Sequence, residues 1–266
     1  MSNPVIAMVG VGVVGKATAE AFHSKGIRCI QIDPAVHPKS KIENALAADI
    51  AMICVPTPMM PTSGRQDTSI VAEVIRNLSA IDYKGLICIK STVLPSFVVD
   101  ICLDYAHLNI CTNPEFLTER TAEDNAADPT FLIIGGSHAD AEYLDSLYRI
   151  VHPELASDWM SAPGAMMFKY LYNTLGAATV SIVNEFYQMH KRLKLDDWGR
   201  IQSVLTIPNM LDERTQVPGP DGKLGFGGKC FPKDCNAIIN MARDLGTPAE
   251  TLEGAIATNH VVRKGE

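Results

Sequence analysis

The first 135 residues of the chain alternate short apolar runs with stretches of helical periodicity. Continuous apolar runs, as opposed to strictly alternating ones, are typical of strands that are buried on both faces. Runs that alternate with helices in this way indicate a parallel sheet covered by helices on both sides. We therefore predict a doubly wound α/β fold. Its strands are expected at 5–9, 27–32, 50–55, 86–90, 108–112 and 131–135.

The pattern changes in the second half of the chain. After residues 152–154 the strand signal stops, and the apolar positions of 162–194 predict one long helix followed by shorter ones. A loop rich in glycine and proline, 218–228, interrupts this helical region. The sequence thus predicts an α/β domain over residues 1–160 and an all-helical domain over 161–266, built on a long central helix.

The first predicted strand leads into a glycine-rich turn. Gly10, Gly12 and Gly15 have the G-x-G-x-x-G spacing, and Asp33 lies 18 residues further on, at the end of the second strand. This context predicts a Rossmann-like dinucleotide fold. In such a fold Gly10 permits the tight turn, Gly12 lets a pyrophosphate approach the backbone, and Gly15 allows helix and strand to pack closely.

Asp33 determines which dinucleotide we expect. Its carboxylate would accept hydrogen bonds from the ribose hydroxyls and repel a 2′-phosphate, which favours NAD over NADP. The helix N-terminus after the turn favours the phosphates. The alternative is a glycine turn in a Rossmann-like fold that binds no nucleotide. Contacts with the cofactor are expected along the turn at Gly10, Val11, Gly12, Val13, Val14 and Gly15.

Polar residues recur four positions apart at three places. These pairs are Glu115 and Glu119, Lys169 and Asn173, and Cys230 and Asp234. On a helix, such residues share one face. Lys169 and Asn173 interrupt an otherwise apolar helix, and their face is expected to meet something polar because burying a lone ammonium group is expensive. Taken singly, each pair is better explained as a solvated face or a local ion pair.

Cys230 follows a Gly-Gly pair and stands where we expect a helix to begin. Helix N-termini and neighbouring cations increase the share of nucleophilic thiolate. Lys229 and Lys233 would both act in this way, whereas Asp234 would oppose it unless it holds a water molecule. The residues alone leave two alternatives open, a nucleophile and a buried core thiol.

The composition is that of an ordinary globular protein and excludes several functions. Of the 266 residues, 47% are hydrophobic, and the net charge of −7 without a basic cluster argues against a nucleic-acid binder. The N-terminus lacks a signal-peptide pattern, and the most apolar stretch, 165–187, is too polar to span a membrane. Seven scattered cysteines without ligand spacing predict reduced thiols in the cytoplasm and no metal site.

The chain resembles the UDP-glucose/GDP-mannose dehydrogenases through seven segments that follow one another in the order of that family. They are "GVGVVG" (10–15), "VPTP" (55–58), "STVLP" (91–95), "NPEFLTE" (113–119), "KYLYN" (169–173), "NE" (184–185) and "GFGGKCFPKD" (225–234). The last is highly specific, and the first is not. The resemblance implies an NAD-dependent enzyme that oxidises the primary alcohol of a nucleotide sugar, such as UDP-glucose, to a carboxylate. It also implies a homodimer formed through the helical domain.

The resemblance assigns roles to the catalytic candidates. After a first hydride transfer, Cys230 is expected to add to the aldehyde as a thiohemiacetal, and a second NAD then gives a thioester that water hydrolyses. Lys169 and Asn173 are expected to stabilise the oxyanion, while Asp234 holds a water molecule. Glu115 is expected to activate water for hydrolysis. Thr92 lies where the family keeps a hydroxyl.

The resemblance also implies binding residues. Besides the glycine turn and Asp33, the cofactor is expected to contact Thr57, Ser91, Thr92 and Glu119. The nucleotide sugar is expected to contact Glu115, Phe116, Leu117, Glu119, Lys169, Asn173, Arg214, Phe226, Gly227, Gly228 and Cys230.

The chain departs from the family pattern in length and at two positions. Family members usually continue into a second α/β domain that grips the nucleotide, and we expect this domain to be absent, either naturally or by truncation. Phe131 stands where the family often has an arginine, and Lys229 replaces a small residue before the cysteine.

Two other functions remain open. One is a two-electron dehydrogenase of the β-hydroxyacid kind, which also has a Lys/Asn pair but does not need Cys230. The other is a non-catalytic binding or assembly homologue, although such a protein has no reason to keep a nucleophile.

Overall fold

The computed structural model describes residues 4–116, 129, 131–206 and 215–264. The chain divides into two compact units. Unit 1 comprises Met1–Pro58 and Gln66–Lys169, and unit 2 comprises Met59–Arg65 and Tyr170–Glu266. The domains predicted from the sequence, 1–160 and 161–266, have other limits than these two units and stay a prediction.

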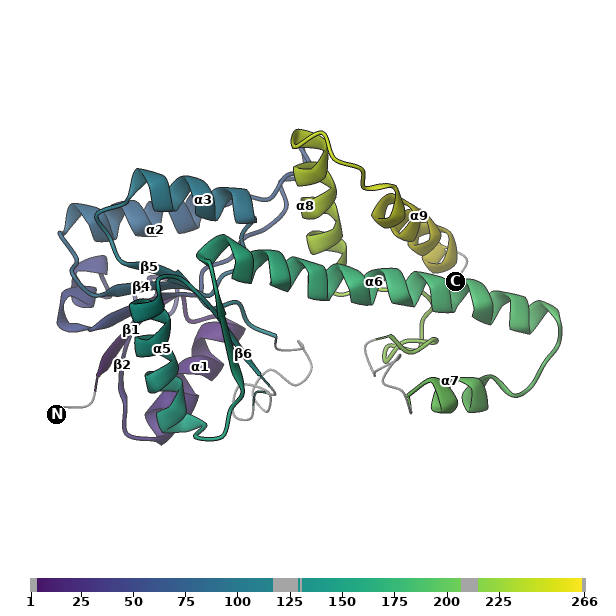
Figure 1. The fold of residues 1–266 in the computed structure, drawn as a ribbon, viewed down its shortest axis with the longest axis horizontal. Coiled ribbons are helices and arrows are strands. Elements are labelled where there is room, and N and C mark those ends of the chain that lie inside the picture. The colour runs from purple at the N-terminus through teal and green to yellow at the C-terminus, as the bar shows by residue number, and fades with distance from the viewer. Residues whose placement is uncertain (1–3, 117–128, 130, 207–214, 265–266) are drawn as a thin grey trace. The chain divides into compact units, whose positions relative to one another are not determined.

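Unit 1 is a sheet of seven strands with helices on both faces. The strands are β1 (Val5–Val9), β2 (Arg28–Ile32), β3 (Ile50–Ile53), β4 (Leu86–Ile89), β5 (Ile110–Thr112), β6 (Leu132–Gly135) and β7 (Ser157–Met160). The helices that cover the sheet are α1 (Val13–Ser24), η1 (Ile42–Ala47), α2 (Ser69–Ala80), α3 (Pro95–Asp104) and α5 (His138–Val151). Figure 1 shows α2 and α3 on one face of the sheet and α1 and α5 on the other. The doubly wound α/β prediction is confirmed.

The strand order is β2-β1-β3-β4-β5-β6-β7, and two features of this sheet correct the sequence analysis. The segment Ser157–Met160 forms a seventh strand, parallel to β6, although no strand was expected beyond residues 152–154. It was missed because an edge strand is only half buried and therefore lacks a continuous apolar run. In addition, β6 runs antiparallel to β5, so the sheet is mixed. The apolar content of a segment indicates how deeply a strand is buried, but not whether the strand runs parallel or antiparallel to its neighbour.

The alternating side chains of the strands build two cores, one on each face. Ile6 and Met8 of β1 face a cluster that includes Phe22 of α1 and residues of α5. Ala7 and Val9, the residues between, face a second cluster with residues of α2 and α3. Because both faces of the sheet are covered, a ligand is expected at the ends of the strands, and in α/β sheets it binds at the carboxyl ends.

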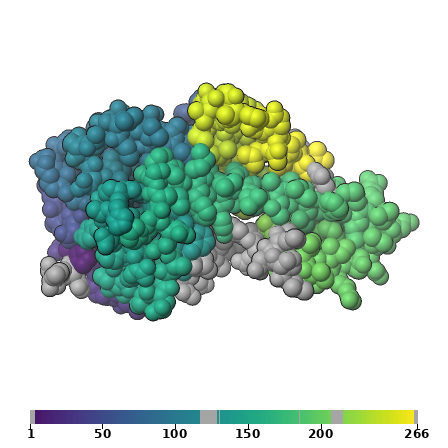
Figure 2. Space-filling view, in the orientation of Figure 1, coloured from purple at the N-terminus to yellow at the C-terminus, as the bar shows by residue number. Residues whose placement is uncertain are grey.

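Unit 2 is helical in the residues that the structure describes, apart from its loops. Its helices are the main part of α6 (Ala162–Arg192), α7 (Trp198–Thr206), α8 (Cys230–Asp244) and α9 (Glu250–Lys264). Helix α6 confirms the predicted long central helix. Figure 2 shows α8 and α9, in yellow, as a closely packed block, and Arg243 of α8 pairs with Glu253 of α9 at 2.7 Å.

A short segment from the first half of the chain belongs to unit 2. Residues 59–65 lie between β3 and α2 in sequence but contact α8. Arg65 donates two hydrogen bonds to the carboxylate of Asp244, at 2.6 and 2.7 Å, and Asn240 donates to the carbonyl of Gly64. None of the described helices has the length and apolar character needed to cross a membrane.

Candidate functional site

The three glycines of the first turn differ in what surrounds them. Gly10 has a φ of +90°, and a Cβ there would lie 2.7 Å from the carbonyl oxygen of Cys54. A Cβ at Gly15 would collide with the carbonyl of Gly10. A Cβ at Gly12, in contrast, would have no protein atom within 4 Å. The fold therefore requires glycine at positions 10 and 15, whereas the open space at Gly12 suits a ligand that approaches the backbone.

The N-terminus of α1 is arranged to receive an anion. Gly12 is its N-cap residue and provides no side-chain cap, and the first turn carries no acidic residue. Val13 is 59% exposed at this end. Because the first N–H groups of a helix lack intrahelical partners, this end attracts phosphate. The turn thus fits the pyrophosphate of a dinucleotide.

Asp33 holds the turn and β2 together. One carboxylate oxygen accepts a hydrogen bond from the backbone N–H of Val11 at 2.8 Å, and the other accepts from Ala35 at 3.0 Å. An ionised carboxylate offers about four acceptor positions, so capacity remains for ribose hydroxyls. Asp33 therefore supports the turn and is also compatible with the predicted cofactor contact.

The carboxyl ends of β3 and β4 are joined by side-chain hydrogen bonds. Thr57 Oγ1 donates to the carbonyl of Thr92 at 2.9 Å, and Gln66 Nε2 donates to the same carbonyl at 2.8 Å. Ser91 Oγ donates to the carbonyl of Val55 at 2.7 Å. The structure thus brings Thr57, Ser91 and Thr92 close together, and their contact with the cofactor stays a prediction. Gln66 was missed, because a lone glutamine in a loop carries no sequence signal.

A buried network next to this region was also missed. The ammonium group of Lys90 donates to Asn113 Oδ1 at 2.8 Å and to the hydroxyl of Tyr148 at 3.0 Å. Tyr148 in turn donates to Asn113 Oδ1 at 2.7 Å, and Asn113 Nδ2 donates to the carbonyl of Ile133. These contacts compensate for the burial of a cation and connect the ends of β4 and β5. Thr92 and Glu115 both lie two residues beyond members of this network.

Glu115 and Lys169 form an ion pair within unit 1. Oε1 and Nζ are 3.7 Å apart, and Lys169 is only 3% exposed. The ammonium group also lies 4.9 Å from the ring centroid of Phe116. The polar partner expected for Lys169 is therefore Glu115, and the contact with Phe116 adds a cation–π attraction.

Phe116 is the centre of an aromatic cluster. Its ring centroid lies 4.6 Å from that of Phe131 and 5.8 Å from that of Phe168. Phe131, the position at which the family often has an arginine, is thus used for packing beside Lys169. Leu117, Glu119 and Arg214, which were also predicted to bind cofactor or substrate, lie outside the described residues.

In unit 2, Cys230 is the first residue of α8, as expected. Its N-cap residue, Lys229, makes no side-chain cap, and no acidic residue lies in the first turn of α8. Gly228 has a φ of +71°, which only glycine adopts readily. The thiol of Cys230 is half-buried at the helix end where a negative charge is stabilised.

Asp234, one turn after Cys230, is 1% exposed. Asn173 Nδ2 donates to Asp234 Oδ2 at 2.6 Å. Lys233 Nζ lies 2.8 Å from Asp234 Oδ1 as an ion pair, although these two atoms do not meet hydrogen-bond geometry. The charge of Asp234 is therefore balanced locally, which reduces its effect on a thiolate at Cys230.

A second cysteine in the same helix has a different environment. Cys235 is fully buried, and burial, followed by the charge of Asp234, raises the pKa of its thiol to about 12. Of the two cysteines on this helix, only Cys230 combines partial exposure with the helix end. Phe226, predicted to bind substrate, is 5% exposed and packs in the apolar core of unit 2, where its ring lies 6.1 Å from that of Phe231.

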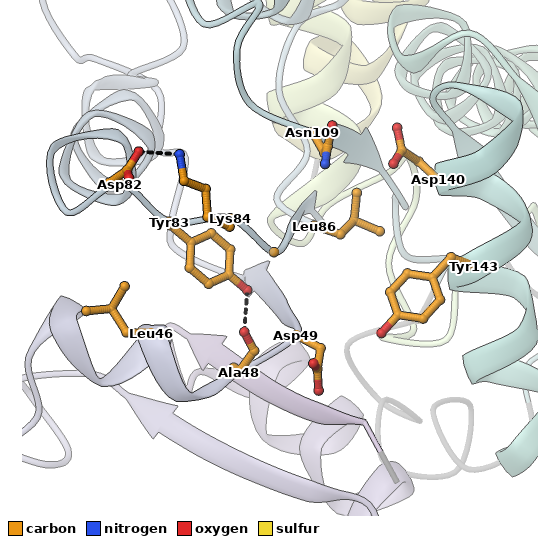
Figure 3. Close-up of a pocket in the computed structure, with 11 residues that line it drawn as sticks. Leu46, Ala48, Asp49, Asp82, Tyr83, Lys84, Leu86, Asn109, Asp140 and Tyr143 are labelled. Carbon is orange, nitrogen blue, oxygen red and sulfur yellow. Dashed lines mark hydrogen bonds and ion pairs between the residues drawn. The ribbon is translucent and has the colours of Figure 1, made fainter. Parts of the chain in front are cut away.

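A cavity of about 510 Å³ lies elsewhere in unit 1 (Figure 3). Asp49, Lys84 and Asn109, which precede β3, β4 and β5, line it together with Asp140 and Tyr143 of α5. It is therefore at the amino ends of the strands, the edge opposite to the glycine turn. None of the predicted site residues lines this cavity. In α/β sheets, ligands bind at the carboxyl ends, so we assign the cofactor site to the turn.

Among the described residues, no group of histidine, cysteine and acidic side chains is disposed to hold a metal ion.

Two sequence models of one family match the chain. Residues 36–152 match the NAD binding domain of the UDP-glucose/GDP-mannose dehydrogenase family, and residues 164–261 match its central domain. NAD is accordingly the cofactor of this fold, in agreement with the geometry of the turn and Asp33.

Individual proteins of known sequence or structure are similar over nearly the whole chain. UDP-glucose 6-dehydrogenase TuaD of Bacillus subtilis (strain 168) is 26% identical over 306 residues, covering 97% of this chain and 64% of that protein. The structure of a UDP-glucose dehydrogenase from Pyrobaculum islandicum has a TM-score of 0.83 at 24% identity, covering 98% of this chain and 68% of that one.

The similarity to the Pyrobaculum islandicum structure, and a third similarity, concern the fold alone. The structure of Mycobacterium tuberculosis 3-hydroxyisobutyrate dehydrogenase has a TM-score of 0.75 at 17% identity, and 91% of that chain is covered.

The chain spans about half to two thirds of the length of the curated relatives that it matches. Taken with the glycine turn and the segment around Cys230, the two matched models show that the chain belongs to the UDP-glucose/GDP-mannose dehydrogenase family.

Proposed function

We propose that the protein is an NAD-dependent dehydrogenase that oxidises the primary alcohol at C6 of a nucleotide sugar to a carboxylate. We propose UDP-glucose as the substrate, with GDP-mannose as the principal alternative within the family. The observation that carries the proposal is Cys230 at the N-terminus of α8, one turn before a buried Asp234 whose charge is balanced by Asn173 and Lys233.

The proposed reaction consumes two NAD per sugar. Bound NAD accepts one hydride in each of two oxidation steps. In unit 1 the open backbone at Gly12, the N-terminus of α1 and Asp33 would hold this cofactor, with Thr57, Ser91 and Thr92 at the ends of the neighbouring strands. In the first step the hydroxyl proton passes to a water molecule and on to solvent, and we infer that Lys169 stabilises the negative charge that develops on the alcohol oxygen.

A nucleophile is needed for the second oxidation. The aldehyde carbon carries a hydride that can leave only after the carbon becomes tetrahedral, and the thiol of Cys230 achieves this by adding to it. The thiol proton moves to solvent, and the oxyanion is stabilised by the Lys169 ammonium and the Asn173 amide. Loss of the second hydride leaves a thioester on Cys230.

Hydrolysis then restores the thiol. A water molecule attacks the thioester carbon, Glu115 removes its proton, and the C–S bond breaks to release the carboxylate. The Lys169 ammonium lies 3.7 Å from the Glu115 carboxylate and orients it. Asp234, both of whose oxygens are engaged by neighbours, is better suited to orient Asn173 than to accept a proton.

A second candidate function is the two-electron oxidation of a β-hydroxyacid. It is favoured by the fold shared with 3-hydroxyisobutyrate dehydrogenase, which extends over most of both chains. That reaction ends after one hydride transfer and leaves the position of Cys230 at the start of α8 unexplained.

We further propose that two copies associate through α6. Its exposed surface carries a continuous apolar stripe, and these side chains are 50–63% exposed. The stripe consists of Leu171, Leu175, Ile182, Phe186 and Met189. The spacing of three, four and seven positions places these residues on one helix face. An exposed apolar stripe of this length is typical of a protein–protein interface. A second copy of α6 would cover it with an equally apolar surface.

The stoichiometry of NADH tests the function. The chain is incubated with NAD and either UDP-glucose or GDP-mannose, and NADH is counted per sugar consumed. Two NADH per sugar support the proposal. One NADH per sugar contradicts the thioester step, whereas turnover only with a β-hydroxyacid, offered in a parallel incubation, supports the second candidate. Binding of NAD without turnover of any substrate contradicts both and indicates a binding protein.

A further inference from the structure

The glycines before Cys230 face the terminal helix α9. Gly225 has a φ of +72°, and a Cβ there would collide with Oδ1 of Asn259 and lie 2.9 Å from Arg263 Cγ. A Cβ at Gly227 would lie 2.7 Å from Arg263 Nη2. The family resemblance implied that Gly227 contacts the substrate, which stays a prediction. In the structure, the absence of a side chain at Gly225 and Gly227 makes room for Asn259 and Arg263.

Asn259 binds both backbone polar groups of one loop residue, Phe226. Its Oδ1 accepts from the backbone N–H of Phe226 at 2.6 Å, and its Nδ2 donates to the carbonyl of Phe226 at 3.0 Å. Asn259 is 7% exposed. A side-chain amide satisfies a donor and an acceptor together, as a neighbouring strand would, and no other side chain of the same size does so.

Arg263, one turn further along α9, binds the loop at three points. Nη1 donates to the carbonyls of Leu224 and Gly225, each at 3.1 Å, and Nη2 donates to Asp221 Oδ2 at 2.8 Å. The hydrogen bond from Arg263 lowers the pKa of Asp221. A lysine would keep a positive charge but could not reproduce the planar fork that reaches all three acceptors.

Helix α6 completes the support. Asn184 Oδ1 accepts from the N–H of Gly225 at 3.0 Å, and Asn184 Nδ2 donates to the carbonyl of Val180. Ser181 donates to the carbonyl of Ala255, which fixes α9 against α6. The backbone of 224–226 is therefore bound at every residue by side chains from two helices.

We propose that Asn259 and Arg263 are positioning residues for Cys230. By fixing the backbone of 224–226, they determine where the chain enters α8 and hold the Cys230 thiol at the N-terminus of that helix. This inference rests on the proposed role of Cys230 as the nucleophile. It assigns α9 a part in the reaction although neither side chain belongs to the proposed reacting groups.

The test uses two conservative variants. Asn259→Asp keeps the acceptor for the Phe226 N–H but replaces the donor with a second oxygen that repels the Phe226 carbonyl. Arg263→Lys keeps the charge beside Asp221 but loses the fork. The control is Arg243→Lys, which alters the exposed ion pair between α8 and α9 and does not touch the loop.

The first measurement is independent of enzymatic activity. Iodoacetamide labelling at pH 7 is followed for Cys230 and Cys235 by peptide mass spectrometry, together with amide hydrogen exchange of the 224–230 segment. In both variants we expect exchange of this segment to accelerate about tenfold and Cys230 labelling to slow at least threefold, since the thiol no longer benefits from the helix end. The control should match the unmodified chain. Unchanged or faster labelling of Cys230 in both variants overturns the proposal.

The second measurement separates positioning from stability. With a nucleotide sugar that turns over, both variants should lower kcat about tenfold while leaving the KM for NAD within twofold, and their melting temperatures should stay near that of the control. A rise in the KM for NAD with unchanged kcat contradicts the proposal. If no sugar turns over, the proposed function fails, and the labelling and exchange results still decide whether α9 positions Cys230.

Discussion

Asn173 and Asp234 are joined by a hydrogen bond of 2.6 Å between the amide Nδ2 and the carboxylate Oδ2, across 61 positions of sequence. Both side chains are buried, and Lys233 lies 2.8 Å from the second oxygen of Asp234. The amide of Asn173 is thereby fixed in one orientation, with its own oxygen turned away from Asp234. The Asp234 carboxylate is the centre of this arrangement.

Removal of that charge should destabilise unit 2. In Asp234→Asn, the Lys233 ammonium loses its counter-charge, and we expect the free energy of unfolding to fall by about 2–3 kcal/mol. Urea unfolding measures the loss. The double variant Asp234→Asn with Lys233→Met has no stranded charge and should recover at least half of it. A double variant as unstable as the single one would disprove the electrostatic explanation.

The roles of Gly10 and Gly12 can be separated by one pair of variants. Gly12→Ala meets no protein atom and should leave the melting temperature unchanged while weakening NAD binding about tenfold or more, on the order of 1.4 kcal/mol. Gly10→Ala adopts a strained φ and collides with Cys54, so it should cost about 1–3 kcal/mol of stability. Calorimetric titration with NAD and thermal melting give both quantities. Equal NAD affinity in Gly12→Ala and the unmodified chain would place the cofactor elsewhere.

The two cysteines of α8 should react differently. Because the pKa of Cys235 is raised to about 12, its thiol stays protonated at pH 8 and should not react with iodoacetamide, whereas Cys230 should be labelled. Deprotonation of the unfolded thiol should lower stability only above about pH 9, where the folded thiol remains neutral. Cys230→Ser should abolish carboxylate formation, and Cys235→Ser should retain it. Preferential labelling of Cys235 would contradict this assignment.

The buried network of unit 1 predicts an order of stabilities. Asn113→Leu strands the Lys90 ammonium and should cost about 3–5 kcal/mol. Lys90→Met should cost less, because Tyr148 still donates to Asn113 at 2.7 Å and the buried charge is gone. The double variant should be more stable than Asn113→Leu alone. Denaturant titration of the three variants tests this order, and the reverse order would show that Lys90 contributes by packing.

The proposed association of two copies has its own test. Leu175→Glu and Phe186→Glu place charges on the apolar stripe of α6, where the unmodified side chains are 63% and 61% exposed, so the isolated fold should tolerate them. Both should convert a dimer to a monomer in sedimentation or light scattering. Gln188→Glu, at an exposed polar position of the same helix, should remain dimeric. A monomeric unmodified chain would overturn the proposal.

Several features could be predicted because they are local. The spacing of Gly10, Gly12 and Gly15 with Asp33 specifies a turn whose geometry depends on residues close in sequence. The long apolar stretch of α6 and the helix start at Cys230 are likewise encoded within one or two turns. Short-range backbone preferences therefore led to the fold class, the cofactor and the candidate nucleophile.

Other features depend on partners far away along the chain. Strand β7 and the direction of β6 were missed, because burial at a sheet edge is partial and hydrophobicity carries no direction. Lys90 gave no sequence signal, since its partner Asn113 directly follows β5 and its partner Tyr148 lies in α5. The purpose of Gly225 and Gly227 could not be inferred before α9 was seen beside them.

The sequence by itself therefore determined an α/β fold with a dinucleotide turn, a long helix, and a cysteine at a helix N-terminus, since each depends on a few neighbouring residues. Only the tertiary structure decided which groups balance the charge of Asp234 and which side chains support the loop before Cys230. It also decided that Gly225 and Gly227 leave room for side chains of α9. The physical reason is that a buried polar group must find its partner in space, and the fold brings that partner from a distant part of the chain.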